Sequence, residues 1–133
     1  MSYKYKHIFV VDDDQVNNFV TEKLLHQFDK GYQISSYTNP LEAFQILENA
    51  NAEPERMPDM ILLDINMPGM NGFEFLEKMK EYNLSSKIQV IMYSSSNNSE
   101  DKKKSSRFSN VIGYLEKPFS AQAYGRILDK TPY

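Results

Sequence analysis

The chain has 133 residues, a length that suits one compact domain, and its 41% apolar and 25% charged residues support a packed core and exclude a disordered chain. A net charge of -3 argues against nucleic acid as a partner, and the lack of cysteine excludes disulfides and thiolate metal sites and favours a reducing, cytoplasmic location. No apolar run approaches the roughly 18 residues needed to span a bilayer, so we expect no membrane insertion.

The first third of the chain predicts two strand–helix units. Residues 8–11 are continuously apolar, the signature of a strand covered on both faces, and three aspartates follow them. Asp14 is placed to cap a helix in which five apolar residues recur at helical spacing: Val16, Phe19, Val20, Leu24 and Phe28. Residues 32–38 predict a weaker strand, and Pro40 opens a second helix. That helix carries three apolar residues on one side: Leu41, Phe44 and Leu47.

The middle of the chain predicts a loop, a buried strand and a third helix. Residues 49–58 are polar and contain two prolines, which is typical of a loop. Residues 60–64 form a second fully apolar run that ends in Asp64. Dense turn residues at 68–72 precede a helix with three inward-facing side chains: Phe75, Leu76 and Met79.

The last third predicts two more strands and two helices. Residues 88–93 form a strand, and the polar, lysine-rich stretch from about 98 to 108 forms at best a surface helix. A short strand at 114–116 runs into Lys117 and Pro118. A final helix at 121–128 carries three apolar residues: Tyr124, Ile127 and Leu128.

Five strand–helix units with both faces covered predict an α/β sandwich built on a parallel sheet. In such sheets ligands bind at the carboxyl ends of the strands. Residues able to do chemistry follow four of the five predicted strands: Asp12, Asp13, Asp64, Ser94 and Lys117. Carboxylates suit Mg²⁺, and a carboxylate can also attack phosphorus to give an aspartyl phosphate. The pattern therefore indicates phosphoryl chemistry at one edge of the sheet.

Four short motifs in chain order carry a resemblance to a known family. They are Val10-Val11-Asp12-Asp13, Leu62-Leu63-Asp64-Ile65-Asn66-Met67-Pro68, Met92-Tyr93-Ser94-Ser95 and Tyr114-Leu115-Glu116-Lys117-Pro118-Phe119. Together they resemble the receiver domain of two-component response regulators, and the similarity runs from about residue 6 to residue 128. The resemblance implies a flavodoxin-like or CheY-like three-layer sandwich, with a five-stranded parallel sheet in the order 2-1-3-4-5 and helices on both faces.

The resemblance also implies a role for each acidic residue. Asp64 would accept a phosphoryl group from a phosphohistidine on a sensor histidine kinase or a histidine phosphotransfer protein. Asp13 and Asp64 would bind Mg²⁺ directly, with Mn²⁺ as a substitute ion. The main-chain carbonyl of Asn66 would be a third ligand, and Asp12 would act through water.

The remaining motif residues resemble a switch. Lys117 would pair with the phosphoryl group, and its peptide bond to Pro118 resembles the family's cis peptide. Ser94, which stands where threonine is commoner, would move towards the new phosphate, and Tyr114 would swing inward. This relay would change the surface built by the fourth helix, fifth strand and fifth helix, which would contact a downstream protein, serve a phosphorelay or form a dimer.

We therefore expect residues 1–133 to be a single receiver domain with a core at about 6–129 and no effector domain. Such a stand-alone response regulator would be a phosphoacceptor signalling domain that at most catalyses its own phosphorylation and dephosphorylation, and would not be a conventional enzyme. Its partners would be proteins rather than nucleic acid.

Three other interpretations remain open from the sequence. Residues 12–16 also fit the motif of haloacid-dehalogenase-like phosphatases, in which Asp12 would be the nucleophile; that interpretation leaves Asp64 and Ser94 unexplained. A pure interaction module without chemistry would bind no Mg²⁺. A flavin carrier on the same fold lacks support because no phosphate-binding loop follows the first strand.

Overall fold

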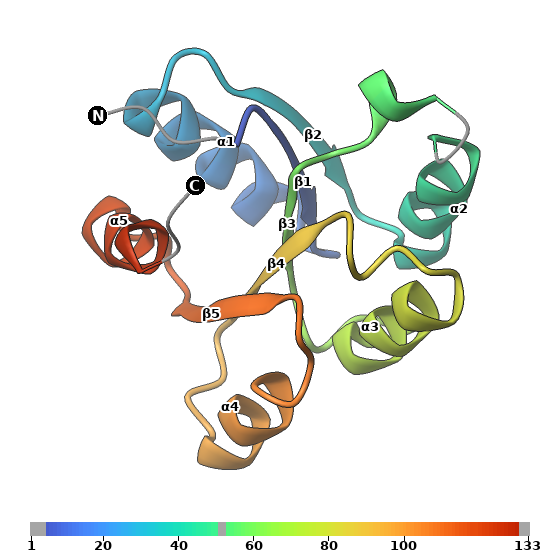
Figure 1. The fold of residues 1–133 in the computed structure, drawn as a ribbon. Helices are drawn as coiled ribbons and strands as arrows, with labels where there is room; N and C mark the ends of the chain where they lie inside the picture. The colour runs from blue at the N-terminus through green and yellow to red at the C-terminus, as the bar shows by residue number, and fades with distance from the viewer. Residues whose placement is uncertain (1–4, 51–52, 131–133) are drawn as a thin grey trace.

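A parallel β-sheet lies between two layers of helices in the computed structural model, which describes residues 5–50 and 53–130 (Figure 1). The strands are β1 (His7–Val11), β2 (Gln33–Tyr37), β3 (Met60–Leu63), β4 (Gln89–Ser94) and β5 (Val111–Glu116). They pair in parallel in the order β2-β1-β3-β4-β5. The predicted fold class and strand order are confirmed.

Five α-helices follow the five strands. They are α1 (Gln15–Phe28), α2 (Pro40–Ala50), α3 (Gly72–Glu81), α4 (Ser99–Ser105) and α5 (Ala121–Asp129). Helices α1 and α5 cover one face of the sheet, α2 and α3 cover the other, and α4 lies beside β5 (Figure 1). Among the described residues, none of these helices combines the length and apolar character required to cross a bilayer.

The sheet has a separate core on each face, which explains the continuous apolar runs in its central strands. In β1, Phe9 and Val11 face the core shared with α2 and α3. Ile8 and Val10 face the core shared with α1 and α5. Because successive strand residues point to opposite faces, a strand covered on both sides is apolar at every position.

Helix α1 forms where it was predicted, but only part of its predicted apolar set faces the core: Leu24 and Phe28 pack against it. Its buried residues are Asn18, Thr21 and Leu25. Its large exposed residues are Val16 at 73%, Phe19 at 60% and Val20 at 46%. The polar residues are buried because they find partners: Asn18 Nδ2 donates to the Asp12 carbonyl at 2.9 Å, and the hydroxyls of Thr21 and Tyr93 lie 2.9 Å apart. Likewise Leu41 on α2 is 52% exposed.

Local capping explains where the helices begin. The Asp14 side chain accepts from the Asn17 amide at the start of α1, which confirms the predicted N-cap. Asn71 and Glu74 form a reciprocal capping box at the start of α3. The loop predicted at 49–58 is shorter than expected, because α2 continues to Ala50 and a 3₁₀ turn occupies Pro54–Arg56.

Candidate functional site

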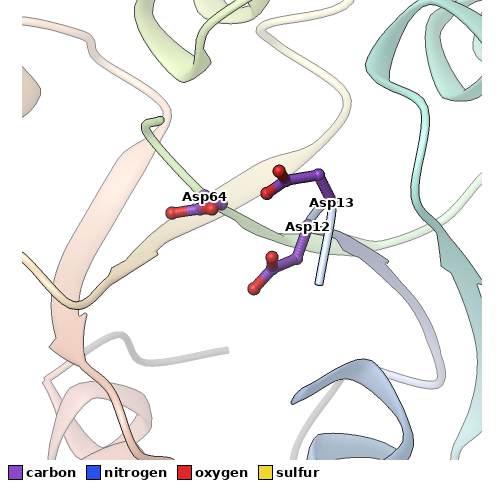
Figure 2. A group of neighbouring side chains, drawn as sticks. All are labelled: Asp12, Asp13 and Asp64. Atoms are coloured by element: carbon purple, nitrogen blue, oxygen red, sulfur yellow. The ribbon is translucent and has the colours of Figure 1, made fainter. Parts of the chain in front are cut away.

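The strand order brings the predicted chemical residues to one edge of the sheet. Asp12 follows β1, Asp64 follows β3, Ser94 ends β4 and Lys117 follows β5 directly. Figure 2 shows the side chains of Asp12, Asp13 and Asp64 lying close together. One carboxylate oxygen from each of these three residues lies within 4.8 Å of the other two. The structure therefore joins residues from β1 and β3 into one acidic cluster.

Asp12 is fully buried, and both of its carboxylate oxygens have partners. Its Oδ1 accepts from the main-chain amide of Asp14 at 2.9 Å. Its Oδ2 accepts from Asn17 Nδ2 at 3.0 Å and pairs with Lys117 Nζ at 2.5 Å. Sequence reasoning missed Asn17, because nothing in its spacing distinguishes a side chain that binds Asp12 from an ordinary first-turn residue.

Asp64 is also buried, with 5% of its surface exposed. Its Oδ1 accepts from the Ile65 amide at 2.8 Å, and its Oδ2 lies 3.4 Å from Lys117 Nζ. Burial, with a smaller contribution from the charge of Asp12, raises the pKa of the Asp64 carboxyl to about 6 against the opposing effect of the Lys117 charge. Asp13, by contrast, is exposed, so solvent reaches the cluster from its side.

Lys117 is the cation that holds the two buried carboxylates together. Burial alone lowers the pKa of its ammonium, but the hydrogen bond to Asp12 and the charges of Asp64 and Asp12 outweigh that effect and raise it. Its main-chain amide donates to the Ser94 carbonyl at 2.9 Å, and the Lys117–Pro118 peptide is cis, as the resemblance implied. Lys117 is therefore charged at neutral pH.

The two predicted switch residues lie on neighbouring strands. Ser94 is 1% exposed, and its Oγ accepts from the Ser96 amide at 3.2 Å. Tyr114 is half-buried on β5, and its hydroxyl donates to the Ser96 carbonyl at 2.8 Å. Both residues therefore bond to the same short segment after β4. Asn66 has an exposed side chain, and the role of its carbonyl stays a prediction.

Gly72 at the start of α3 packs directly against the backbone of Asp64. Its amide donates to the Ile65 carbonyl at 2.8 Å, and a Cβ at this position would lie 2.4 Å from the Asp64 carbonyl oxygen. The sequence identifies Gly72 only as a turn glycine. Its contact with the strand end depends on the tertiary fold, so no local signal could have found it.

The donor set of the cluster fits a hard divalent cation. Three carboxylates converge there, and Lys117 supplies a single positive charge. Carboxylate oxygens are ligands that Mg²⁺ prefers, and Mg²⁺ keeps several waters, for which the exposed side at Asp13 leaves room.

Comparison with known proteins agrees with this arrangement. The family model described as the response regulator receiver domain matches residues 8–128. The chain belongs to the response regulator receiver family. This receiver domain resembles a two-component response regulator from Cytophaga hutchinsonii, with a TM-score of 0.86, 30% identity and 96% of each chain covered. It also resembles chemotaxis protein CheY4 of Vibrio cholerae, with a TM-score of 0.72, 26% identity and coverage of 96% of this chain and 99% of that chain.

Curated relatives place the same domain in longer proteins. The probable transcriptional regulator ycf29 of Porphyra purpurea is 31% identical over 92% of this chain and 53% of its own length. The sensor histidine kinase CheAY of Helicobacter pylori is 28% identical over 86% of this chain and 13% of its own length. The chain thus spans about half or less of these relatives.

The phosphatase interpretation is not favoured. The family match extends over both acidic strand ends, including Asp64, which that interpretation left unexplained. Asp12, its required nucleophile, is fully buried with both carboxylate oxygens engaged. The receiver domain is a signalling domain rather than a conventional enzyme.

Proposed function

We propose that this receiver domain accepts a phosphoryl group on Asp64 from a phosphohistidine of a sensor histidine kinase or a histidine phosphotransfer protein. The observation that carries the proposal is the cluster in which Asp12, Asp13 and Asp64 converge beside Lys117. In the transfer, an Asp64 carboxylate oxygen bonds to phosphorus as the histidine nitrogen–phosphorus bond breaks.

The residues around Asp64 have two proposed roles in this transfer, which are to bind the metal ion and to neutralise the phosphoryl oxygens. Asp13, Asp64 and the carbonyl of Asn66 are the proposed ligands of Mg²⁺ or Mn²⁺, with Asp12 acting through water. When bound, the ion supplies positive charge that neutralises the oxygens of the moving phosphoryl group. Lys117, already 3.4 Å from Asp64 Oδ2, supplies a second positive charge at the same place.

The new charge is the source of the signal. Phosphorylation replaces the single negative charge of the Asp64 carboxylate with a phosphoryl group that carries a charge of about −1.5 to −2, at a buried position. In our proposal Ser94 donates to a phosphoryl oxygen, and Tyr114 gives up its bond to the Ser96 carbonyl and turns inward. The α4–β5–α5 surface then changes, and it serves a downstream protein, a phosphorelay or a dimer, in a cytoplasmic setting. The single-domain organisation stays a prediction.

A small-molecule phosphodonor tests the phosphorylation step directly. The protein is treated with acetyl phosphate with and without Mg²⁺, and its intact mass is measured. We expect a gain of one phosphoryl group in the wild type that requires Mg²⁺ and is lost in Asp64→Asn. Asp14→Asn is the matched control, because it removes an equal charge from the same edge while keeping a side chain that caps α1.

Two results would overturn the proposal. One is labelling of Asp64→Asn to the same extent as the wild type, and the other is full labelling without a divalent ion. Labelling that survives in Asp64→Asn but is lost in Asp12→Asn would instead favour the phosphatase-like nucleophile.

A further inference from the structure

A crevice of about 370 Å³ opens between α1 and the end of β2, beside the aspartate cluster but lined by none of its three aspartates. Helix α1 contributes Phe19 and Glu22 to its lining, and the segment from β2 into α2 contributes Tyr37 and Glu42. Among the residues that line it, two are carboxylates and none is lysine, arginine or histidine. The crevice therefore favours a positively charged occupant.

The lining of the crevice also contains oxygen atoms that lack hydrogen-bond partners. Asn18 is only 3% exposed, and its Nδ2 donates to the Asp12 carbonyl, which fixes the orientation of the amide because a carbonyl can only accept. Within the described part of the chain, Asn18 Oδ1 and Ser36 Oγ have no partner. Buried polar atoms are normally satisfied, so Asn18 Oδ1 needs a donor from outside the chain, and Ser36 Oγ needs either a donor or an acceptor.

Two aromatic side chains complete the lining. Phe19 is 60% exposed, and Tyr37 is half-buried at the end of β2. The Phe19 ring already makes a cation–π contact, since Lys23 Nζ lies 4.8 Å from its centroid. Lys23 itself does not line the crevice. Aromatic faces attract cations, and the planar guanidinium group also stacks on them.

We propose that this crevice is a binding site for a guanidinium group. Guanidinium carries only donors, which matches Glu22, Glu42 and the unpartnered Asn18 oxygen, and its flat shape matches the aromatic lining. The group comes either from a small free cation or from an arginine side chain of a partner protein. Asn18 joins the crevice to the main chain of Asp12, but binding there does not depend on phosphorylation of Asp64.

Agmatine, a small guanidinium compound, is the probe for this site. It is titrated into ¹⁵N-labelled protein in saturating Mg²⁺, and amide shifts are followed by NMR. We expect the largest shifts at residues 15–22 and 36–42. In Glu22→Gln/Glu42→Gln the dissociation constant should rise at least fivefold. Glu77→Gln/Glu81→Gln removes two equally negative, exposed side chains from α3 and should leave the constant within a factor of two.

A second comparison tests the guanidinium preference itself. 1,4-Diaminobutane replaces the guanidinium of agmatine with an ammonium, and we expect it to bind at least threefold more weakly. Phe19→Leu keeps an apolar side chain but removes the ring, and should abolish that difference. N-acetylargininamide represents an arginine side chain within a protein. If it binds more tightly than agmatine, the guanidinium group is assigned to a partner protein. If it binds more weakly than agmatine, the guanidinium group is assigned to a small free cation.

Three outcomes would overturn the proposal: shifts confined to residues 12–14 and 64, equal weakening in both double variants, or equal affinity for agmatine and 1,4-diaminobutane. Each would mean that agmatine is attracted only by the general negative charge. Acetyl phosphate labelling of Glu22→Gln/Glu42→Gln should match the wild type, so failure of this proposal and failure of Asp64 phosphorylation are told apart.

Discussion

In the metal-free protein, Lys117 pairs with both buried carboxylates of the site and offsets part of the cost of burying their negative charges. Its ammonium contacts Oδ2 of Asp12 and lies 3.4 Å from Oδ2 of Asp64. Carboxylates this deeply buried are costly to ionise unless a cation pairs with them. The raised pKa of Asp64, about 6, shows that burial still outweighs the single positive charge. The site is therefore electrostatically incomplete, which is a reason for it to take up a cation.

Replacing Lys117 with methionine should destabilise the metal-free protein by about 3 kcal/mol at pH 7.5, because Asp12 is left buried without its cation. The cost should shrink at pH 5. The pKa of Asp64 is raised in the fold, and losing Lys117 raises it further, so protonation favours the folded state as pH falls through this range. Urea unfolding followed by circular dichroism at both pH values measures the change.

Lys102→Met is the matched control for this experiment. Lys102 pairs with Glu116 on the surface, where both side chains are nearly half exposed, so its loss should cost under about 1 kcal/mol with little dependence on pH. Equal destabilisation by the two substitutions at pH 7.5, or no recovery of Lys117→Met at pH 5, would contradict the role assigned to Lys117.

At the scale of elements, the start of α3 is fixed by the absence of a side chain at Gly72. A Cβ there would lie 2.4 Å from the Asp64 carbonyl oxygen, and the three nearest atoms all belong to the backbone of Asp64 and Ile65, which cannot move aside as a flexible side chain could. Gly72→Ala should therefore destabilise the protein by about 2–3 kcal/mol, in the range of overpacked cores, and slow labelling of Asp64 by acetyl phosphate. Thermal unfolding and the rate of mass gain are the measurements.

Gly125→Ala provides the comparison, because Gly125 lies inside α5 and a Cβ there meets only ordinary contact with Phe28 at 3.5 Å. Alanine is the better helix former, so this substitution should stabilise the protein by about 0.5–1 kcal/mol and leave labelling unchanged. If Gly72→Ala behaved like Gly125→Ala, the close approach to Asp64 would have no consequence.

Strands were easier to predict than helix faces. Strand β3 is buried at all four positions, so its apolar run alone revealed both its type and its place in the sheet. Helix α1 was predicted from apolar spacing, yet Val16 and Phe19 face solvent. Spacing shows which residues share a face, but the face that packs depends on distant partners such as Tyr93, which bonds to Thr21. No local pattern contains that information.

At the scale of the whole molecule, strand order creates the site from distant segments. β1 pairs with both β2 and β3, and β3 pairs with β4, so the ends of β1 and β3 meet at the centre of the sheet. The motifs predicted this meeting because parallel strands end at the same edge. They could not predict Asn17 or Gly72, whose importance lies in contacts made after the sheet assembles.

Within the core shared with α1 and α5, a buried pair of tyrosines joins the segment before β2 to α5, and this pair should make stability fall at alkaline pH. The hydroxyls of Tyr32, just before β2, and Tyr124 on α5 lie 3.0 Å apart. Burial strongly raises the pKa of Tyr124, with a further contribution from Tyr32. Below pH 10 neither folded nor unfolded chain ionises this group. Above it the unfolded chain alone releases the proton, so unfolding becomes more favourable as pH rises.

Tyr124→Phe removes that titration and should flatten the fall in unfolding free energy between pH 9 and pH 11. At pH 8 it should cost about 1 kcal/mol, because the Tyr32 hydroxyl loses its partner. Urea unfolding across this range measures both effects. Tyr82→Phe is the matched control, since Tyr82 is 43% exposed and should keep the wild-type slope. Identical slopes in Tyr124→Phe and the wild type would mean that groups other than Tyr124 cause the alkaline loss of stability.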